Sequence, residues 1–170
     1  MPKPKCIIRQ AEEKDLLAIL EITNYEILKG TALYHYKQKT LEEQKLWFEN
    51  KLAAKRPVLV LEQNKVVVGF GTYDTFRPFE GFKYSVEHSL YIHKNFRGLG
   101  LGKLLLKALI SQAKKDRLHT MIAGIDAENK ASISLHYQLG FREVGRFPEV
   151  GFKFERWLDL VFMQLNLSKK

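Results

Sequence analysis

The stretch Arg97–Lys103, RGLGLGK, places glycines at positions 98, 100 and 102, directly before a leucine-rich run. Glycine inside a helix-forming segment costs about 1 kcal/mol relative to alanine, so this arrangement needs a reason. The first turn of a helix leaves about four backbone N–H groups without partners and carries partial positive charge. Without side chains in the way, a pyrophosphate can approach these donors, and Arg97 and Lys103 add positive charge beside them. The stretch therefore predicts a strand-to-helix turn that binds an anion.

Two other phosphate-binding motifs contain glycines in a similar arrangement, and the spacing argues against both. A phosphate loop of the form G-x-x-x-x-G-K-[ST] needs a glycine where Arg97 stands and a hydroxyl where Leu104 stands, so it is excluded. A dinucleotide-binding loop needs G-x-G-x-x-G near the start of a βαβ unit, whereas these glycines follow G-x-G-x-G after several predicted antiparallel strands. A tight turn without a ligand is a further alternative, although one glycine would suffice for it.

The spacing of apolar residues predicts a mixed α/β fold. Alternating runs indicate strands, and apolar residues three and four positions apart indicate amphipathic helices. Thr40 and Glu43 form a capping-box pattern, and Gln63–Asn64–Lys65 marks the turn of a hairpin. We expect, in order, a strand at 6–9, helices at 11–28 and 40–54, a hairpin at 57–76, a strand at 83–96, a helix from 101, a strand at 119–126, a helix at 129–141 and two strands ending at 167. This order implies a sheet with a largely antiparallel start and one parallel β-α-β crossover.

The same periodicity identifies the side of each element that we expect to face the core. The predicted core positions are Leu16, Ile19, Leu20, Thr23 and Ile27 in the first helix, Leu41, Phe48 and Leu52 in the second, Leu101, Leu104, Leu105, Ala108 and Leu109 in the third, and Tyr84, Val86, His88, Leu90 and Ile92 in the strand at 83–96.

Composition limits the class of protein. A length of 170 residues with 45% hydrophobic residues fits one domain, 1–170. No apolar run approaches the roughly 18 residues of a membrane span, and the first residues lack the apolar core of a signal peptide. Cys6 is the only cysteine, so we expect a soluble cytoplasmic protein without an internal disulfide. The net charge of +9 suits a solvated surface or an anionic ligand, and its spread along the chain argues against a nucleic-acid partner.

Four motifs together resemble a known family. The segment Arg97–Gly102 resembles the coenzyme A pyrophosphate loop of the GNAT superfamily of N-acetyltransferases. The segments VEHSLYI at 86–92, N-x-x-S-x-x-x-H at 129–136 and GFK…W-x-D at 151–159 resemble the phosphinothricin and methionine sulfoximine N-acetyltransferase group within it. The resemblance covers nearly the whole chain.

This resemblance implies the GNAT fold, a central, mostly antiparallel sheet with one parallel β-α-β crossover and flanking helices. It implies acetyl-CoA as cosubstrate and direct acetylation of the α-amino group of a small amino acid, such as phosphinothricin, methionine sulfoximine or methionine sulfone, in a ternary complex. It also implies a homodimer. Another amine or a protein N-terminus is the alternative acceptor.

Catalysis of this kind requires a base, because an α-ammonium group must lose a proton before its nitrogen can attack a thioester. The resemblance assigns this role to Glu87, acting directly or through a water. The superfamily usually has a tyrosine acid seven residues after the asparagine at position 129, where this chain has His136. His136 is therefore the first choice for the acid, and Tyr137 is the alternative.

Binding roles follow from both the resemblance and the residue types. The implied acetyl-CoA contacts are the main chain of Leu90, Tyr91 and Ile92, where the family commonly has a β-bulge, the turn residues Arg97, Gly98, Leu99, Gly100, Leu101, Gly102 and Lys103, and Asn129, which could equally be only a helix N-cap. An arginine fork can hold a carboxylate bidentately, so Arg77 is the candidate substrate clamp if it is not a plain surface residue. The remaining substrate candidates are Pro78, Phe79, Glu87, His88 and Ser89. The histidines show no ligand spacing, so we expect no metal.

Overall fold

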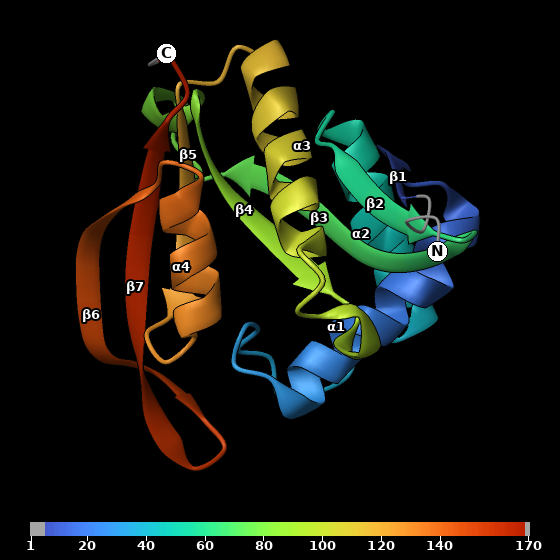
Figure 1. Ribbon diagram of the computed structural model, residues 1–170, viewed down its shortest axis with the longest axis horizontal. Coiled ribbons are helices and arrows are strands. Elements are labelled where there is room, and N and C mark those ends of the chain that lie inside the picture. The colour runs from blue at the N-terminus through green and yellow to red at the C-terminus, as the bar shows by residue number, and fades with distance from the viewer. Residues whose placement is uncertain (1–5, 169–170) are drawn as a thin grey trace.

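The computed structural model describes residues 6–168, which form a seven-stranded sheet with helices on both faces (Figure 1). The strands are β1 (Cys6–Gln10), β2 (Val58–Gln63), β3 (Val66–Thr75), β4 (Ser85–Ile92), β5 (Thr120–Asp126), β6 (Arg142–Lys153) and β7 (Arg156–Asn166). The α-helices are α1 (Leu16–Lys29), α2 (Leu41–Ala53), α3 (Leu101–Lys115) and α4 (Lys130–Gln138). The predicted order of strands and helices is confirmed.

The strands lie in the order β1-β2-β3-β4-β5-β7-β6. Every neighbouring pair is antiparallel except β4 and β5, which are parallel. Helix α3 connects these two strands and so forms the single parallel crossover that the sequence predicts.

Strand β2 explains why the sheet is covered on both faces. Successive side chains of a strand point to opposite faces. Leu59 and Leu61 belong to the core beneath α3, whereas Val58 and Val60 belong to a second core with α1 and α2. Both sets are buried, so β2 reads as a continuous apolar run and needs a helical layer on each side.

Three predicted core positions are wrong. Leu52 is 58% exposed, because α2 turns Gln44, Phe48 and Lys51 toward the sheet instead. Leu104 is 46% exposed, because the buried stripe of α3 includes Leu101, Leu105, Leu106, Leu109 and Ala113. Tyr84 is exposed because it precedes the first paired residue of β4. In the two helices an adjacent position, Lys51 or Leu105, is buried instead.

Strands β4 and β5 position the site because they are paired over only a short distance. Ser85–Glu87 of β4 pair with Thr120–Ile122 of β5, and the two strands form no further pairs with each other. Beyond Glu87 the two strands diverge, which Figure 1 shows as a widening gap between β4 and β5. The expected β-bulge in β4 is not present, since β3 and β4 keep one register from Gly69–Ile92 to Thr75–Val86. Divergence from β5 alone therefore leaves one edge of residues 88–92 open.

Candidate active site

A cavity of about 210 Å³ lies where β4 and β5 diverge. Helix α4 and the segment after α1 complete its walls. The lining includes Ala32, Leu33, Glu87, His88, Ser89, Leu90, Tyr91, Ala123, Gly124, Ile125, Asp126, Asn129, Ser132, Leu135 and His136. The structure thus brings together seven residues that the sequence assigned to catalysis, acetyl-CoA or substrate: Glu87, His88, Ser89, Leu90, Tyr91, Asn129 and His136.

The glycine turn precedes α3 at one end of the diverging strands. Gly98 has φ 76° and Gly100, the N-cap of α3, has φ 75°. Residues with a Cβ rarely adopt this left-handed conformation, so the backbone itself requires these two glycines. Apart from the adjoining residues of the chain, no atom lies within 4 Å of where a Cβ would stand at either position. The open space and the first-turn N–H groups fit a pyrophosphate.

Gly102 has a different environment. A Cβ there would lie 3.4 Å from Leu135 and 3.8 Å from both Leu90 and Ile92, which are ordinary packing distances. Its φ is not in the left-handed region. Gly102 thus brings α3 close to β4 and α4, and the conformational demand falls on Gly98 and Gly100.

The two basic residues of the turn are held by neighbouring elements. The Arg97 guanidinium pairs with Glu26 of α1, and its Nε donates to the backbone oxygen of Ile92 at 3.1 Å. Lys103 Nζ donates to Gln138 Oε1 at 2.9 Å. Burial raises the pKa of the Glu26 carboxyl, and the charge of Arg97 opposes this shift. Positive charge therefore flanks the turn on both sides, partly balanced by Glu26.

Glu87 is half-buried on β4, next to β5. Its Oε1 lies so close to Gly124 that a Cβ on that glycine would be 2.9 Å away. Burial raises the pKa of Glu87, and the charge of Arg77 works in the opposite direction. A carboxylate whose pKa is raised toward neutrality is better matched to accept a proton from an ammonium group.

His88 and His136 form a buried, stacked pair, with 2.9 Å between their Nε2 atoms. His136 Nδ1 lies 2.7 Å from the backbone oxygen of Ser132. A carbonyl oxygen can only accept, so Nδ1 of His136 carries the proton, and its Nε2 accepts from His88. Burial lowers the pKa of His136, and burial together with His136 lowers the pKa of His88 to about 3. Both rings are neutral at neutral pH, and Nδ1 of His88 is buried without a partner.

Three predicted substrate residues lie outside the cavity. Arg77, Pro78 and Phe79 are exposed in the connection between β3 and β4, and none of them lines either cavity next to Glu87. The Arg77 guanidinium lies 4.9 Å from the centre of the Phe76 ring. Arg77 is still close enough to Glu87 for its charge to act on that carboxyl.

Asn129 and Tyr137 differ in what the structure assigns to them. Asn129 caps α4, accepting from the backbone N–H of Ser132 at 3.0 Å, and it also lines the cavity. Tyr137 is exposed and does not line the cavity, whereas His136 does. Of the two candidate acids, only His136 faces the diverging strands.

Two parts of the site were not among the residues predicted from the sequence. Residues 31–35 line an adjoining cavity of about 370 Å³ together with Glu87, Gly124, Asp126 and Leu160. This loop has no periodicity, so no pattern could have identified it. Gly124 could have been found, because an isolated glycine inside a predicted strand often marks close approach by another group.

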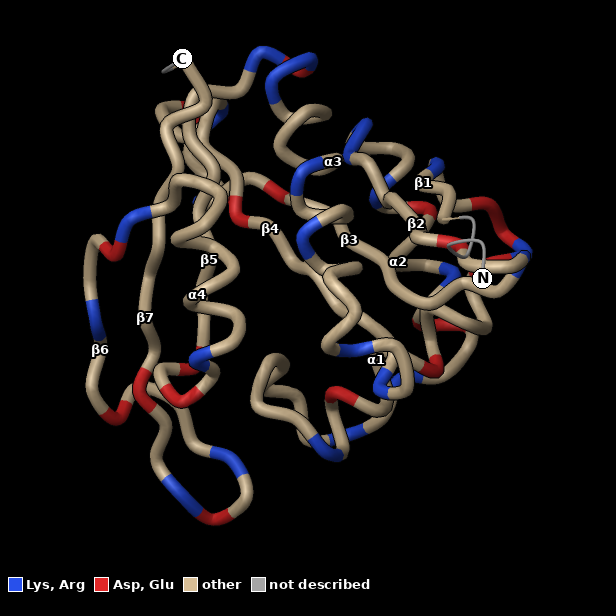
Figure 2. Tube along the Cα trace, viewed as in Figure 1, with Lys and Arg blue, Asp and Glu red and all other residues tan. Residues whose placement is uncertain are grey.

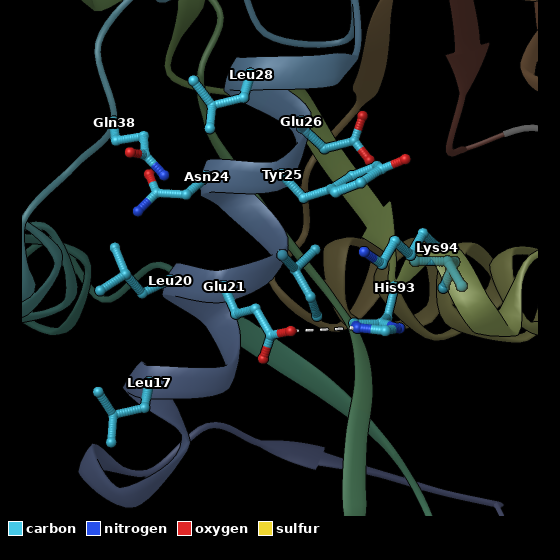
Figure 3. Close-up of a pocket in the computed structure, with 12 residues that line it drawn as sticks. Leu17, Leu20, Glu21, Asn24, Tyr25, Glu26, Leu28, Gln38, His93 and Lys94 are labelled. Carbon is cyan, nitrogen blue, oxygen red and sulfur yellow. Dashed lines mark ion pairs between the residues drawn. The ribbon is translucent and has the colours of Figure 1, made fainter.

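A separate cavity of about 400 Å³ lies on the outer side of α1 (Figure 3). Leu17, Leu20 and Leu28 line it beside polar groups, and His93 lies 3.5 Å from Glu21 across it. None of the glycine turn residues lines it.

Lys and Arg are distributed over most of the elements (Figure 2). Among residues 6–168, no three or more His, Cys, Asp and Glu side chains are grouped to hold a metal ion. In the same range, no helix is both long and apolar enough to span a membrane.

Known proteins resemble the chain in both sequence and structure. Residues 22–141 match the profile of the acetyltransferase (GNAT) family. The chain is 44% identical over 162 residues to the L-methionine sulfoximine/L-methionine sulfone acetyltransferase of Salmonella typhimurium, covering 95% of each chain. It is 33% identical to the phosphinothricin N-acetyltransferase of Alcaligenes faecalis, over 96% of this chain and 83% of that one. The structure of YncA from Salmonella typhimurium with its cofactor acetyl-CoA matches with a TM-score of 0.94 and 43% identity, over 97% of this chain and 95% of that one.

Proposed function

We propose, because the chain belongs to the acetyltransferase (GNAT) family, that it transfers an acetyl group from acetyl-CoA to the α-amino group of a small amino acid. Methionine sulfoximine, methionine sulfone and phosphinothricin are the acceptors that the names of the relatives suggest. The observation that carries the proposal is the placement of Glu87, a half-buried carboxyl at the point where β4 and β5 diverge. Transfer is direct, within a ternary complex.

The residues of the turn and of β4 fit the cosubstrate. Acetyl-CoA supplies the activated acetyl thioester. The backbone N–H groups after Gly100 bind its pyrophosphate, with Arg97 and Lys103 beside them. The open edge of Leu90, Tyr91 and Ile92 binds the pantetheine arm, and an N–H there orients the thioester carbonyl. Asn129 contributes from the N-terminus of α4.

Proton movement is assigned to two side chains. Glu87 accepts the proton of the substrate ammonium group, directly or through a water. His136 is the candidate for returning a proton to the departing thiolate. Its Nε2 accepts from His88 and its single proton, on Nδ1, is donated to the Ser132 carbonyl. To act as the acid, the ring must therefore leave His88 and take up a proton at Nε2, such as the proton released by the substrate ammonium group, before it protonates the thiolate.

Arg77 lines neither cavity, but its charge acts on Glu87, so it is the candidate to select a free amino acid over other amines at the entrance to the site. A bidentate pair with a carboxylate stabilises binding by on the order of 1.5–3 kcal/mol, or roughly 10- to 100-fold in kcat/KM. Methionine sulfone should therefore react faster than its methyl ester, and Arg77→Ala should remove most of that preference. Equal kcat/KM for acid and ester in the wild type contradicts the clamp and favours an amine or a protein N-terminus as acceptor. A screen of amino acids and amines with acetyl-CoA identifies the preferred one.

We further infer a cytoplasmic homodimer. Strand β6 is one of the two edges of the sheet and carries large apolar side chains in exposed positions, among them Val144, Phe147, Val150 and Phe152. An exposed apolar edge strand is a natural pairing surface. Light scattering should report about twice the chain mass of 19.8 kDa, and a value near 19.8 kDa at micromolar concentration contradicts the dimer.

A further inference from the structure

The segment after α1, residues 30–36, forms one wall of the active site. Ala32 and Leu33 line the cavity that contains Glu87 and His136. Thr31–His35 line the adjoining cavity, which also contains Glu87 and Gly124. No residue of the glycine turn lines either cavity, whereas Glu87 lines both. This wall therefore lies beside the proposed general base, Glu87, and away from the turn that fits the pyrophosphate. Figure 1 shows the segment between α1 and α4.

This segment contains no helix or strand of its own, so other elements must hold its shape. Three consecutive residues of β6 contact it. Tyr34 packs on Gly151, where a Cβ would lie only 2.7 Å from the ring. The hydroxyl of Tyr36 donates to the backbone oxygen of Phe152 at 2.6 Å. These residues, with Lys153, are the GFK of the motif GFK…W-x-D at 151–159.

Lys153 provides the strongest of these contacts. Its Nζ donates to the backbone oxygens of Gly30 at 2.6 Å, Leu33 at 2.5 Å and Glu26 at 3.3 Å. The first two belong to the segment and the third to the last turn of α1, where a positive charge is favourable. One ammonium group therefore fixes both ends of the turn between Gly30 and Leu33.

Burying this lysine is costly. Lys153 is 2% exposed, and burial lowers the pKa of its ammonium group, partly opposed by the charge of Glu26. A buried ammonium group is tolerated only when its donors are satisfied, and here backbone oxygens satisfy them. An apolar residue at this position would avoid the desolvation cost but would leave the carbonyls of the segment without a donor.

We propose that Gly151–Lys153 is a clasp that holds residues 30–36 as the acceptor-binding wall of the active site, with Lys153 as the positioning residue. The proposal rests on the proposed N-acetyltransferase function. It assigns the clasp to the amino acid side of the reaction, because its segment lies against Glu87 and not against the turn that fits acetyl-CoA. The clasp also gives the GFK motif its role.

The test compares Lys153→Met with a matched control, Lys51→Met. Lys51 is also a buried lysine, but its Nζ contacts Asp74 and the backbone oxygen of Tyr73, and it lines neither cavity. Both variants lose a buried ammonium group, so a general loss of stability appears in both. We expect KM for the acceptor amino acid to rise about tenfold in Lys153→Met only, with KM for acetyl-CoA unchanged.

Tyr36→Phe provides a milder variant, since Tyr36 is exposed and its loss of one hydroxyl does not threaten folding. It should raise the same KM by a smaller factor. Equal changes in both KM values, or no change in either for Lys153→Met, contradict the clasp.

Backbone NMR relaxation separates failure of the clasp from failure of the proposed function, because it needs no turnover. Order parameters of the backbone N–H groups of residues 30–36 should be lower in Lys153→Met than in wild type or Lys51→Met. Unchanged order parameters overturn the clasp. If the wild type acetylates no amino acid, the proposed function fails, and the order parameters still decide whether Lys153 holds the segment.

Discussion

The glycine turn at residues 97–103 and the segment at residues 30–36 flank the same diverging strands, but their shapes are determined in different ways. The turn requires positive φ at Gly98 and Gly100, and the amino acids that allow it are in the turn itself. The segment has no such local requirement and is held by Gly151–Lys153, far away in the sequence. A local backbone requirement is visible in a sequence, whereas a wall fixed by distant contacts is visible only in the folded chain.

Glu87 lies between the two regions, and its replacement should have the largest effect. Glu87→Gln keeps the shape of the side chain and removes the base, so kcat should fall by about 100-fold or more. Calorimetry should show that acetyl-CoA binding is retained, because the turn is untouched. A variant with the wild-type rate between pH 6 and 9 would show that Glu87 is not the base.

The turn itself is tested by two glycine substitutions with opposite expectations. Gly100→Val places a β-branched residue at φ 75°, and its side chain enters the space assigned to pyrophosphate. Acetyl-CoA affinity should fall at least about tenfold, the equivalent of roughly 1.4 kcal/mol. Gly102→Ala adds a methyl group at ordinary packing distances and should bind nearly normally.

Circular dichroism controls for folding in both glycine variants. Unchanged affinity in a folded Gly100→Val protein would mean that the turn is only a structural connection. Equal losses in both variants would mean that close packing of α3, rather than the turn conformation, governs binding.

The smallest expected effect is a shift in pH dependence. Glu87 must be ionised to act as a base, so kcat/KM falls as pH decreases through its pKa. Burial raises that pKa and the charge of Arg77 lowers it. Arg77→Ala should therefore move the acidic limb of the kcat/KM profile to higher pH. A limb that does not move, or that moves to lower pH, contradicts the charge coupling between these residues.

Much of the fold could be predicted because the patterns that specify it are local. The capping box at Thr40 and Glu43 forms as expected, with Glu43 N–H donating to Thr40 Oγ1 at 3.2 Å. The order of elements follows from apolar periodicity. The errors at Leu52 and Leu104 arise because a leucine-rich helix offers more than one apolar stripe, and only packing against the sheet selects between them.

The site could be predicted less completely, and for a different physical reason. Glu87 and the glycine turn could be predicted because each belongs to a short, distinctive motif, VEHSLYI at 86–92 and RGLGLGK at 97–103. Lys153 reads as a surface residue in sequence, because the carbonyls that satisfy its ammonium group come from α1 and the following segment. The pairing of His88 with His136 likewise depends on how β4 meets α4.

The short pairing of β4 with β5 has a mechanical consequence. The sheet consists of two half-sheets, β1–β4 and β5–β7, that are paired with each other only at Ser85–Glu87 and Thr120–Ile122. A ligand that binds between the open edges of β4 and β5 adds contacts to both half-sheets where pairing between the strands is missing. Because such a ligand binds only the folded chain, it raises the free energy of unfolding by mass action. The two halves should therefore unfold more nearly as one cooperative unit when the cosubstrate is bound than when it is absent.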